Sequence, residues 1–135
     1  MAEISEVLDH VRRLLKDEVL PPLEEDLAAV SGLPEIHDDL KALREISRSF
    51  SEGDFSLEIK TGGIIPGCLK ILQAHLRQMI RQIQKMEEGD FTQRVQFMGE
   101  FSTAFNSMIA KMDSTLRELK QKEEDLEALA ESLRD

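Results

Sequence analysis

The stretch that decides the fold is PGCLKILQAHLRQMIRQIQKMEEGDF, which runs from Pro66 to Phe91. Its apolar residues alternate at intervals of three and four, which is the spacing of a coiled-coil seam. Proline suits a first helical turn, as at Pro66, and glycine suits a left-handed helix end, as at Gly89. The pattern predicts a helix over residues 66–88. The bundle seam on this helix consists of Leu69, Leu72, Leu76, Met79, Ile83 and Met86.

A second stripe with the same spacing predicts a long helix from about residue 100 to 134. Thr115 and Lys122 interrupt the stripe, and polar seam residues fix register at a cost in stability. At about 1.5 Å per residue the helix would be roughly 50 Å long. We expect its distal half to pair with a second copy, because an uncovered leucine stripe is unfavourable in water. The stripe consists of Phe105, Met108, Met112, Thr115, Leu119, Lys122, Leu126, Leu129 and Leu133.

The chain before Pro66 predicts three shorter helices. Apolar residues recur at helical spacing over residues 3–20, and Pro21-Pro22 interrupts this pattern. The stripe expected to be buried there comprises Ile4, Leu8, Val11 and Leu15, with Val7 and Leu14 beside it. A short helix follows over residues 23–31. Pro34 then opens a third helix, which ends at Gly53.

Two segments that precede the last two helices look extended. Apolar and polar residues alternate over residues 54–65, and apolar residues recur over 90–99. Twelve residues are too few for a sheet, so we interpret both segments as connectors that insert apolar side chains into a helical bundle. The expected connector plugs are Phe55, Ile59, Phe91 and Val95, and the connector glycines are Gly53, Gly63, Gly89 and Gly99.

The two connectors are copies of one another. EGDFS at residues 52–56 recurs as EGDFT at residues 88–92, 36 positions later and without gaps. Ile59 then matches Val95, whereas Lys70 stands where Asn106 stands in the second copy. Each copy is a helix, a connector and a helix, and the helix over residues 66–88 belongs to both. A helical solenoid needs about three such repeats, so we rank that architecture low.

The run GDFTQRV at residues 89–95, followed by GEFSTAFNSM at 99–108, resembles the HAMP signalling module. The resemblance covers residues 70–122 and, with fewer matching positions, 37–88. Two departures stand out: the connector between Gly89 and Gly99 is shorter than the family's, and Gln96-Phe97 replaces an acidic pair. The resemblance implies a parallel homodimeric four-helix bundle that converts motion of an input domain into activity of an output domain.

The expected fold class is therefore all-α, a helical bundle or coiled coil with two short extended connectors and tandem HAMP-like units. Residues 1–33 would form a helical input or cap segment. The first HAMP-like unit would span residues 34–88 and the second 66–122, with the helix 66–88 shared. Residues 123–135 would extend the coiled coil toward an output domain, such as the histidine kinase or diguanylate cyclase that the resemblance implies.

Composition excludes several other classes. The formal net charge is −10, from 27 acidic and 17 basic residues. Such acidity disfavours nucleic acid and anionic membrane surfaces, which attract basic proteins. The single Cys68 excludes an internal disulfide and fits a reducing compartment. With no apolar run near the length of a membrane span, we expect a cytoplasmic protein without membrane contact.

No motif for catalysis or cofactor binding occurs, so we expect no enzyme and no cofactor. His37-Asp38-Asp39-Leu40-Lys41 lacks the proline of a phosphoacceptor helix, and we interpret His37 as a surface residue. His75 should flank the bundle. The acidic residues around His37 are interpreted as a solvated helix start, not a metal site. Cys68 is expected to be small and buried.

Three functions stay open at this point. The first is a non-catalytic signal relay, in which Met79, Met86, Met108 and Met112 repack at low cost between two states. The second is a helical sensory domain with a small-molecule pocket between residues 1–33 and the helix 66–88. The third is a static coiled-coil dimerisation scaffold. The first two differ in whether purified protein carries a ligand, and the third predicts one packing under all conditions.

Overall fold

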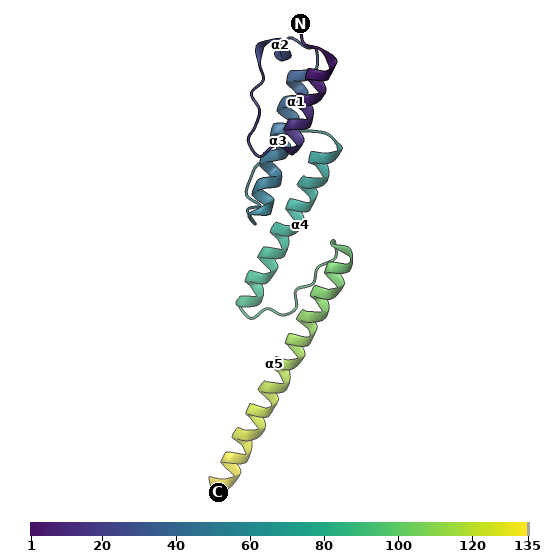
Figure 1. The fold of residues 1–135 in the computed structure, drawn as a ribbon. Helices are drawn as coiled ribbons and strands as arrows, with labels where there is room; N and C mark the ends of the chain where they lie inside the picture. Colours follow the sequence, from purple (N-terminus) through teal and green to yellow (C-terminus); the bar gives the residue numbers. More distant parts are fainter. Residues whose placement is uncertain (135) are drawn as a thin grey trace. The chain divides into compact units, whose positions relative to one another are not determined.

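The computed structural model describes residues 1–134, where it contains helices and no strand, and this confirms the all-α class. Its helices form two compact units, an N-terminal unit of Met1–Leu72 and a C-terminal unit that begins at Gln73. The helices are α1 (Ile4–Lys16), α2 (Glu25–Ala28), α3 (Leu33–Ser51), α4 (Ile64–Glu87) and α5 (Gly99–Arg134) (Figure 1). The first connector occupies residues 52–63 and the second 88–98.

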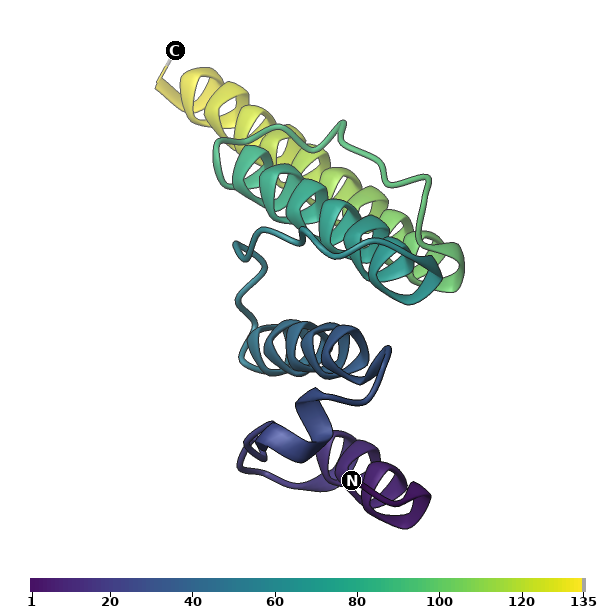
Figure 2. The same cartoon turned by 90° about the horizontal axis from the view of Figure 1, so that it is seen from above.

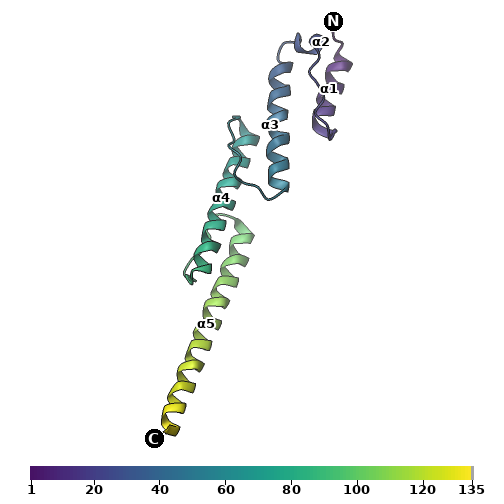
Figure 3. The ribbon, with the colours of Figure 1, turned by 90° about the vertical axis from the view of Figure 1, so that its left-hand side faces the viewer.

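In the N-terminal unit, α1 and α3 run in the same direction (Figures 1 and 3). The segment 17–32, which contains α2, carries the chain back from the end of α1 to the start of α3. Leu14, Leu33 and Ile46 are at most 2% exposed and form the apolar core of this unit. The stripe expected to be buried on α1 is instead largely exposed, with Ile4 at 79%, Leu8 at 64% and Leu15 at 66%, and only its Val11 is half-buried. Within residues 1–134, α1 packs mainly against α3, so it buries one face, and that face carries His10 and Leu14.

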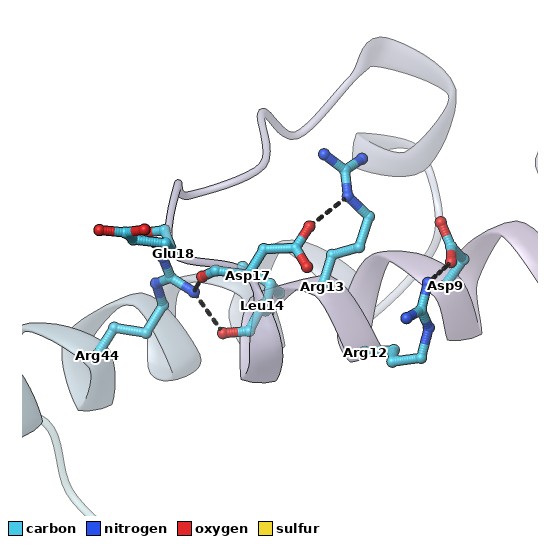
Figure 4. A network of polar contacts seen from close by, with 7 residues as sticks. All are labelled: Asp9, Arg12, Arg13, Leu14, Asp17, Glu18 and Arg44. Carbon is cyan, nitrogen blue, oxygen red and sulfur yellow. Dashed lines mark hydrogen bonds and ion pairs between the residues drawn. The ribbon is translucent and has the colours of Figure 1, made fainter.

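α1 ends at Lys16, four residues earlier than predicted. The Arg44 guanidinium on α3 donates hydrogen bonds to the carbonyls of Leu14 at 2.9 Å, Asp17 at 2.6 Å and Glu18 at 2.8 Å (Figure 4). The last carbonyls of a helix lack internal partners, and Arg44 satisfies that of Leu14 together with those of Asp17 and Glu18 just beyond α1. Arg44 thus holds the chain where α1 ends, before it reaches the prolines.

In the C-terminal unit, α4 and α5 also run in the same direction, because the second connector carries the chain back along them (Figures 2 and 3). The buried core draws Met79 from α4, Val95 from the connector, and Phe105 and Ile109 from α5. The connector therefore supplies part of the packing between the two helices. Half-buried apolar residues surround this core, namely Met86, Phe91, Phe97 and Met98.

The distal part of α5 makes no core within the single chain. Every residue from 114 to 134 is exposed, a length of about 30 Å at the helical rise. Its leucines are among the exposed residues, with Leu119 at 58% and Leu126 at 67%. This exposed apolar stripe is the main feature of the fold that the single chain leaves without packing.

Candidate functional site

The two connectors begin with the same backbone structure. Gly53 has φ +77° and Gly89 has φ +97°, the left-handed region that favours glycine. In each copy the glycine N–H bonds to the carbonyl three residues before it. The following aspartate, Asp54 or Asp90, bonds through its N–H to the carbonyl five residues before it. The sequence repeat is therefore also a repeat of structure, and its first element is a glycine-terminated helix.

Each aspartate then fixes the start of its connector. Asp54 Oδ1 accepts hydrogen bonds from the N–H of Ser56 at 2.9 Å and from its hydroxyl at 2.6 Å. Asp90 Oδ1 accepts the same two bonds from Thr92, and Gln93 donates to Asp90 Oδ2 at 2.7 Å. The bonds from Thr92, and then that from Gln93, lower the pKa of Asp90 below its ordinary value. Both aspartates are turn residues, and at Asp90 the turn stabilises the ionised form.

The connector plugs differ in how deeply they lie. Ile59 is 5% exposed and Val95 is 1% exposed, and these two occupy equivalent positions in the repeat. Phe55 and Phe91 are half-buried. Phe55 contacts Phe50 edge-on, with ring centroids 5.3 Å apart. The β-branched position of each connector is thus the more deeply buried one.

The second connector is tied to both of its helices. The Asn106 carboxamide on α5 accepts from the Val95 N–H at 2.7 Å and donates to the Val95 carbonyl at 2.7 Å. Gln82 on α4 donates to the Arg94 carbonyl at 3.0 Å. Lys70, at the position equivalent to Asn106, has no acceptor atom and cannot make this pair of bonds. Any shift of α4 along α5 must therefore break or rearrange contacts of residues 94 and 95.

The far end of the second connector contacts α4 through an aromatic side chain. Phe97 stacks on His75 of α4 with ring centroids 4.4 Å apart. Phe97 also packs against the core of the C-terminal unit. The Met98 N–H donates to Ser102 Oγ at 2.7 Å, just before Gly99 opens α5 at φ +51°. An aromatic contact thus holds this end of the connector.

The bundle seam is only partly covered in the single chain. Met79 and Phe105 are buried, whereas α5 leaves Met108 at 49%, Met112 at 40% and Leu119 at 58% exposure. Ile109, beside the predicted seam, is fully buried instead, because the face of α5 next to the seam packs on the connector. The remaining seam residues are Leu69, Leu76 and Met86, which are half-buried, and Leu72 and Ile83, which are 37% and 41% exposed.

Two predictions about single residues were wrong. His37 is not a surface residue: it is 7% exposed and hydrogen-bonded to His10, because the first turns of α3 face α1. Cys68 is exposed, since it lies on the outer side of the first turns of α4. The sequence carried no signal for the His10–His37 pair or for Arg44, because both depend on which face of α1 meets α3.

A cavity of about 440 Å³ lies between α1 and α3 in the N-terminal unit. Leu14, Leu40 and Leu43 supply its apolar wall, and Arg44 and Arg48 its charged edge. Across residues 1–134, no three His, Cys, Asp or Glu side chains are grouped so that they could hold a metal ion. The small-molecule pocket expected against the helix 66–88 remains a prediction.

Compared with known proteins, the chain gives no significant match to a family model, a curated protein or a solved structure. Within residues 1–134, every helix is too short or too polar to cross a membrane.

Proposed function

We propose that this chain is a non-catalytic signal-relay region of HAMP type from a bacterial cytoplasmic sensor protein. It works as a parallel homodimer and passes a conformational change through α4 and α5 to a C-terminal output domain, such as a histidine kinase or diguanylate cyclase. The observation that carries the proposal is the contrast within the C-terminal unit. Val95 of the connector is buried and the connector is bonded to both helices, while much of the seam beside it is exposed.

The exposed seam supports pairing with a second copy. Met108, Met112, Leu119 and Leu126 lie at intervals of four and seven, and each is at least 40% exposed. Such spacing presents one continuous stripe to a neighbouring helix. Burying a leucine side chain contributes roughly 1.5–3 kcal/mol when burial is complete, so several half-exposed residues in each copy supply a substantial driving force. A second α5 in register offers the same stripe at the same heights.

The connectors support a relay in preference to a rigid scaffold. Val95 lies between the two helices, and its backbone bonds to α5 while its neighbour bonds to α4. A relay needs two packings that differ by only a few kcal/mol. The methionines of the seam suit such a switch, because flexible thioethers fill differently shaped gaps at low cost.

Disulfide cross-linking of two positions on α5 tests the proposal. Leu119→Cys lies on the seam, and Glu118→Cys is its matched control one residue away. Both are made in a Cys68→Ser background, because Cys68 is exposed. The relay predicts fast cross-linking at position 119 and slow cross-linking at 118. Adding Val95→Asp to disturb the connector should then change the ratio of the two rates.

An unchanged ratio in the Val95→Asp background, with both variants still dimeric, would contradict the relay. That outcome would leave the static scaffold as the better account of the seam. Equal and slow rates at both positions in the starting background would contradict a parallel pairing of α5 altogether.

A further inference from the structure

The N-terminal unit holds a buried pair of histidines that belongs neither to a connector nor to the bundle seam. His10 on α1 is 3% exposed and His37 on α3 is 7% exposed. Their ring nitrogens, Nε2 of His10 and Nδ1 of His37, are 2.9 Å apart, and the rings stack with an interplanar angle of 17°. The two side chains thus join α1 to α3 by a hydrogen bond inside the interface.

This bond depends on the number of protons that the pair carries. A neutral imidazole has one N–H donor and one acceptor nitrogen, so one ring donates and the other accepts. When both rings are protonated, both facing nitrogens are donors and the bond cannot form. Two like charges would then also face each other in a site with little access to water, where charge is costly.

The charged groups around His10 do not cancel this cost. Asp9 from α1 and Glu24 before α2 favour the imidazolium, whereas Arg13 on α1 and His37 on α3 oppose it. Glu6 and Asp26 line the same cavity as His10, and Arg13 is bonded to Asp17 at 3.1 Å. On the α3 side, the exposed Asp38 follows His37 in the chain. Burial is the largest influence, and it lowers the pKa of His10 below its ordinary value.

We propose that the His10–His37 pair is an acid-sensitive latch, which holds α1 against α3 near neutral pH and releases α1 as the solution becomes mildly acidic. In an undocked α1, His10 is free to titrate at its ordinary value near 6.5. Docking lowers this pKa. The latch is therefore fully present above the ordinary pKa near 6.5 and is lost as pH falls through the lower pKa that His10 has when α1 is docked. Protons would thereby act on the N-terminal unit whether or not α5 pairs with a second copy.

The rest of the interface allows such a release. α1 has 13 residues, and its Ile4, Leu8 and Leu15 lie outside the packing. Besides the histidines, the buried Leu14 and the Arg44 bonds near its end hold α1 to α3. An isolated helix of this length is only marginally stable in water. Losing the latch should therefore expose α1 amides without unfolding the C-terminal unit.

Hydrogen exchange of the α1 amides tests the latch in the whole chain. Exchange is followed at about pH 7.5 and about pH 5.5, which bracket the titration of an ordinary histidine, and corrected for intrinsic rates. Lower pH is avoided, because the net charge vanishes near the pI of 4.8. We expect the opening constant of α1 to rise in acid, by at most about tenfold at pH 5.5, which is one pH unit below the ordinary pKa of histidine.

Two variants separate the latch from other acid effects. His10→Gln combined with His37→Gln retains groups that hydrogen-bond but do not titrate, and it should abolish the pH dependence in α1. His75→Gln removes the third histidine, in the C-terminal unit, and should leave it unchanged. All samples contain a chelator, because paired imidazoles also bind Zn²⁺.

A direct titration decides the matter even if the double variant fails to fold. The ring protons of His10 in the wild-type chain, followed by NMR, should titrate below the ordinary value near 6.5. Titration at or above that value would overturn the proposal. So would α1 amides whose corrected exchange is the same at both pH values, or an equal pH dependence in the double variant.

Discussion

Replacing Asn106 by alanine removes the carboxamide that bonds both backbone groups of Val95. Val95 is 1% exposed, so its N–H and carbonyl are left with little access to water. A buried backbone group without a partner costs about 1–3 kcal/mol. With two such groups, and some relief from water entering beside the half-buried Asn106, we expect a loss of roughly 2–4 kcal/mol.

The chain has no Trp or Tyr, so intrinsic fluorescence is a poor probe and amide exchange is the better assay. A loss of about 2 kcal/mol corresponds to roughly 30-fold faster opening of the second connector, read at the Val95 amide. Ser107→Ala is the matched control, because Ser107 is exposed one residue further along α5 and should change the rate little. An Asn106→Ala variant whose Val95 amide exchanges at the wild-type rate would refute the role of this carboxamide.

Three further predictions concern the second connector and its helix end. Val95→Asp buries an unpaired charge at a 1% exposed site, and thermal unfolding by circular dichroism should show a loss of at least about 3 kcal/mol; a small change would argue against burial. Gly89→Ala should cost about 1–2 kcal/mol because its φ is +97°, and no atom within 4 Å of the added Cβ would contribute a clash. In a urea titration of both variants, Gly62→Ala should change the free energy of unfolding little. The Asp90 carboxyl should titrate below 3.8 by NMR, so the turn is intact above that value, and the Thr92 amide should lose protection, after correction for intrinsic exchange rates, as pH falls through the lowered pKa.

Features that depend on neighbours in sequence were predictable. The helix over residues 66–88 was marked by Pro66 and Gly89 and by its apolar spacing, and α4 runs from Ile64 to Glu87. The connectors were found from the EGDF repeat, because a glycine that ends a helix and an aspartate that caps a turn act over only a few residues. Val95, expected as a plug, lies in the core.

Features that depend on which helix faces meet were not predictable. The stripe of α1 with Ile4 and Leu8 is the more apolar one, yet α1 docks through His10 and Leu14. The long reach of Arg44, from α3 to the end of α1, has no periodic signature. Ile109 was overlooked because the three-and-four spacing marks a seam between helices, whereas this residue packs on a connector.

The central claim is that the exposed stripe of α5 is covered by a second α5 lying parallel to it. Light scattering of the 15.4 kDa chain, combined with oxidation of a Leu119→Cys, Cys68→Ser variant, tests it most directly. We predict a particle of twice the chain mass that is converted rapidly and almost completely to a disulfide-linked dimer. A particle of single-chain mass, or a dimer that does not cross-link at position 119, would contradict the claim.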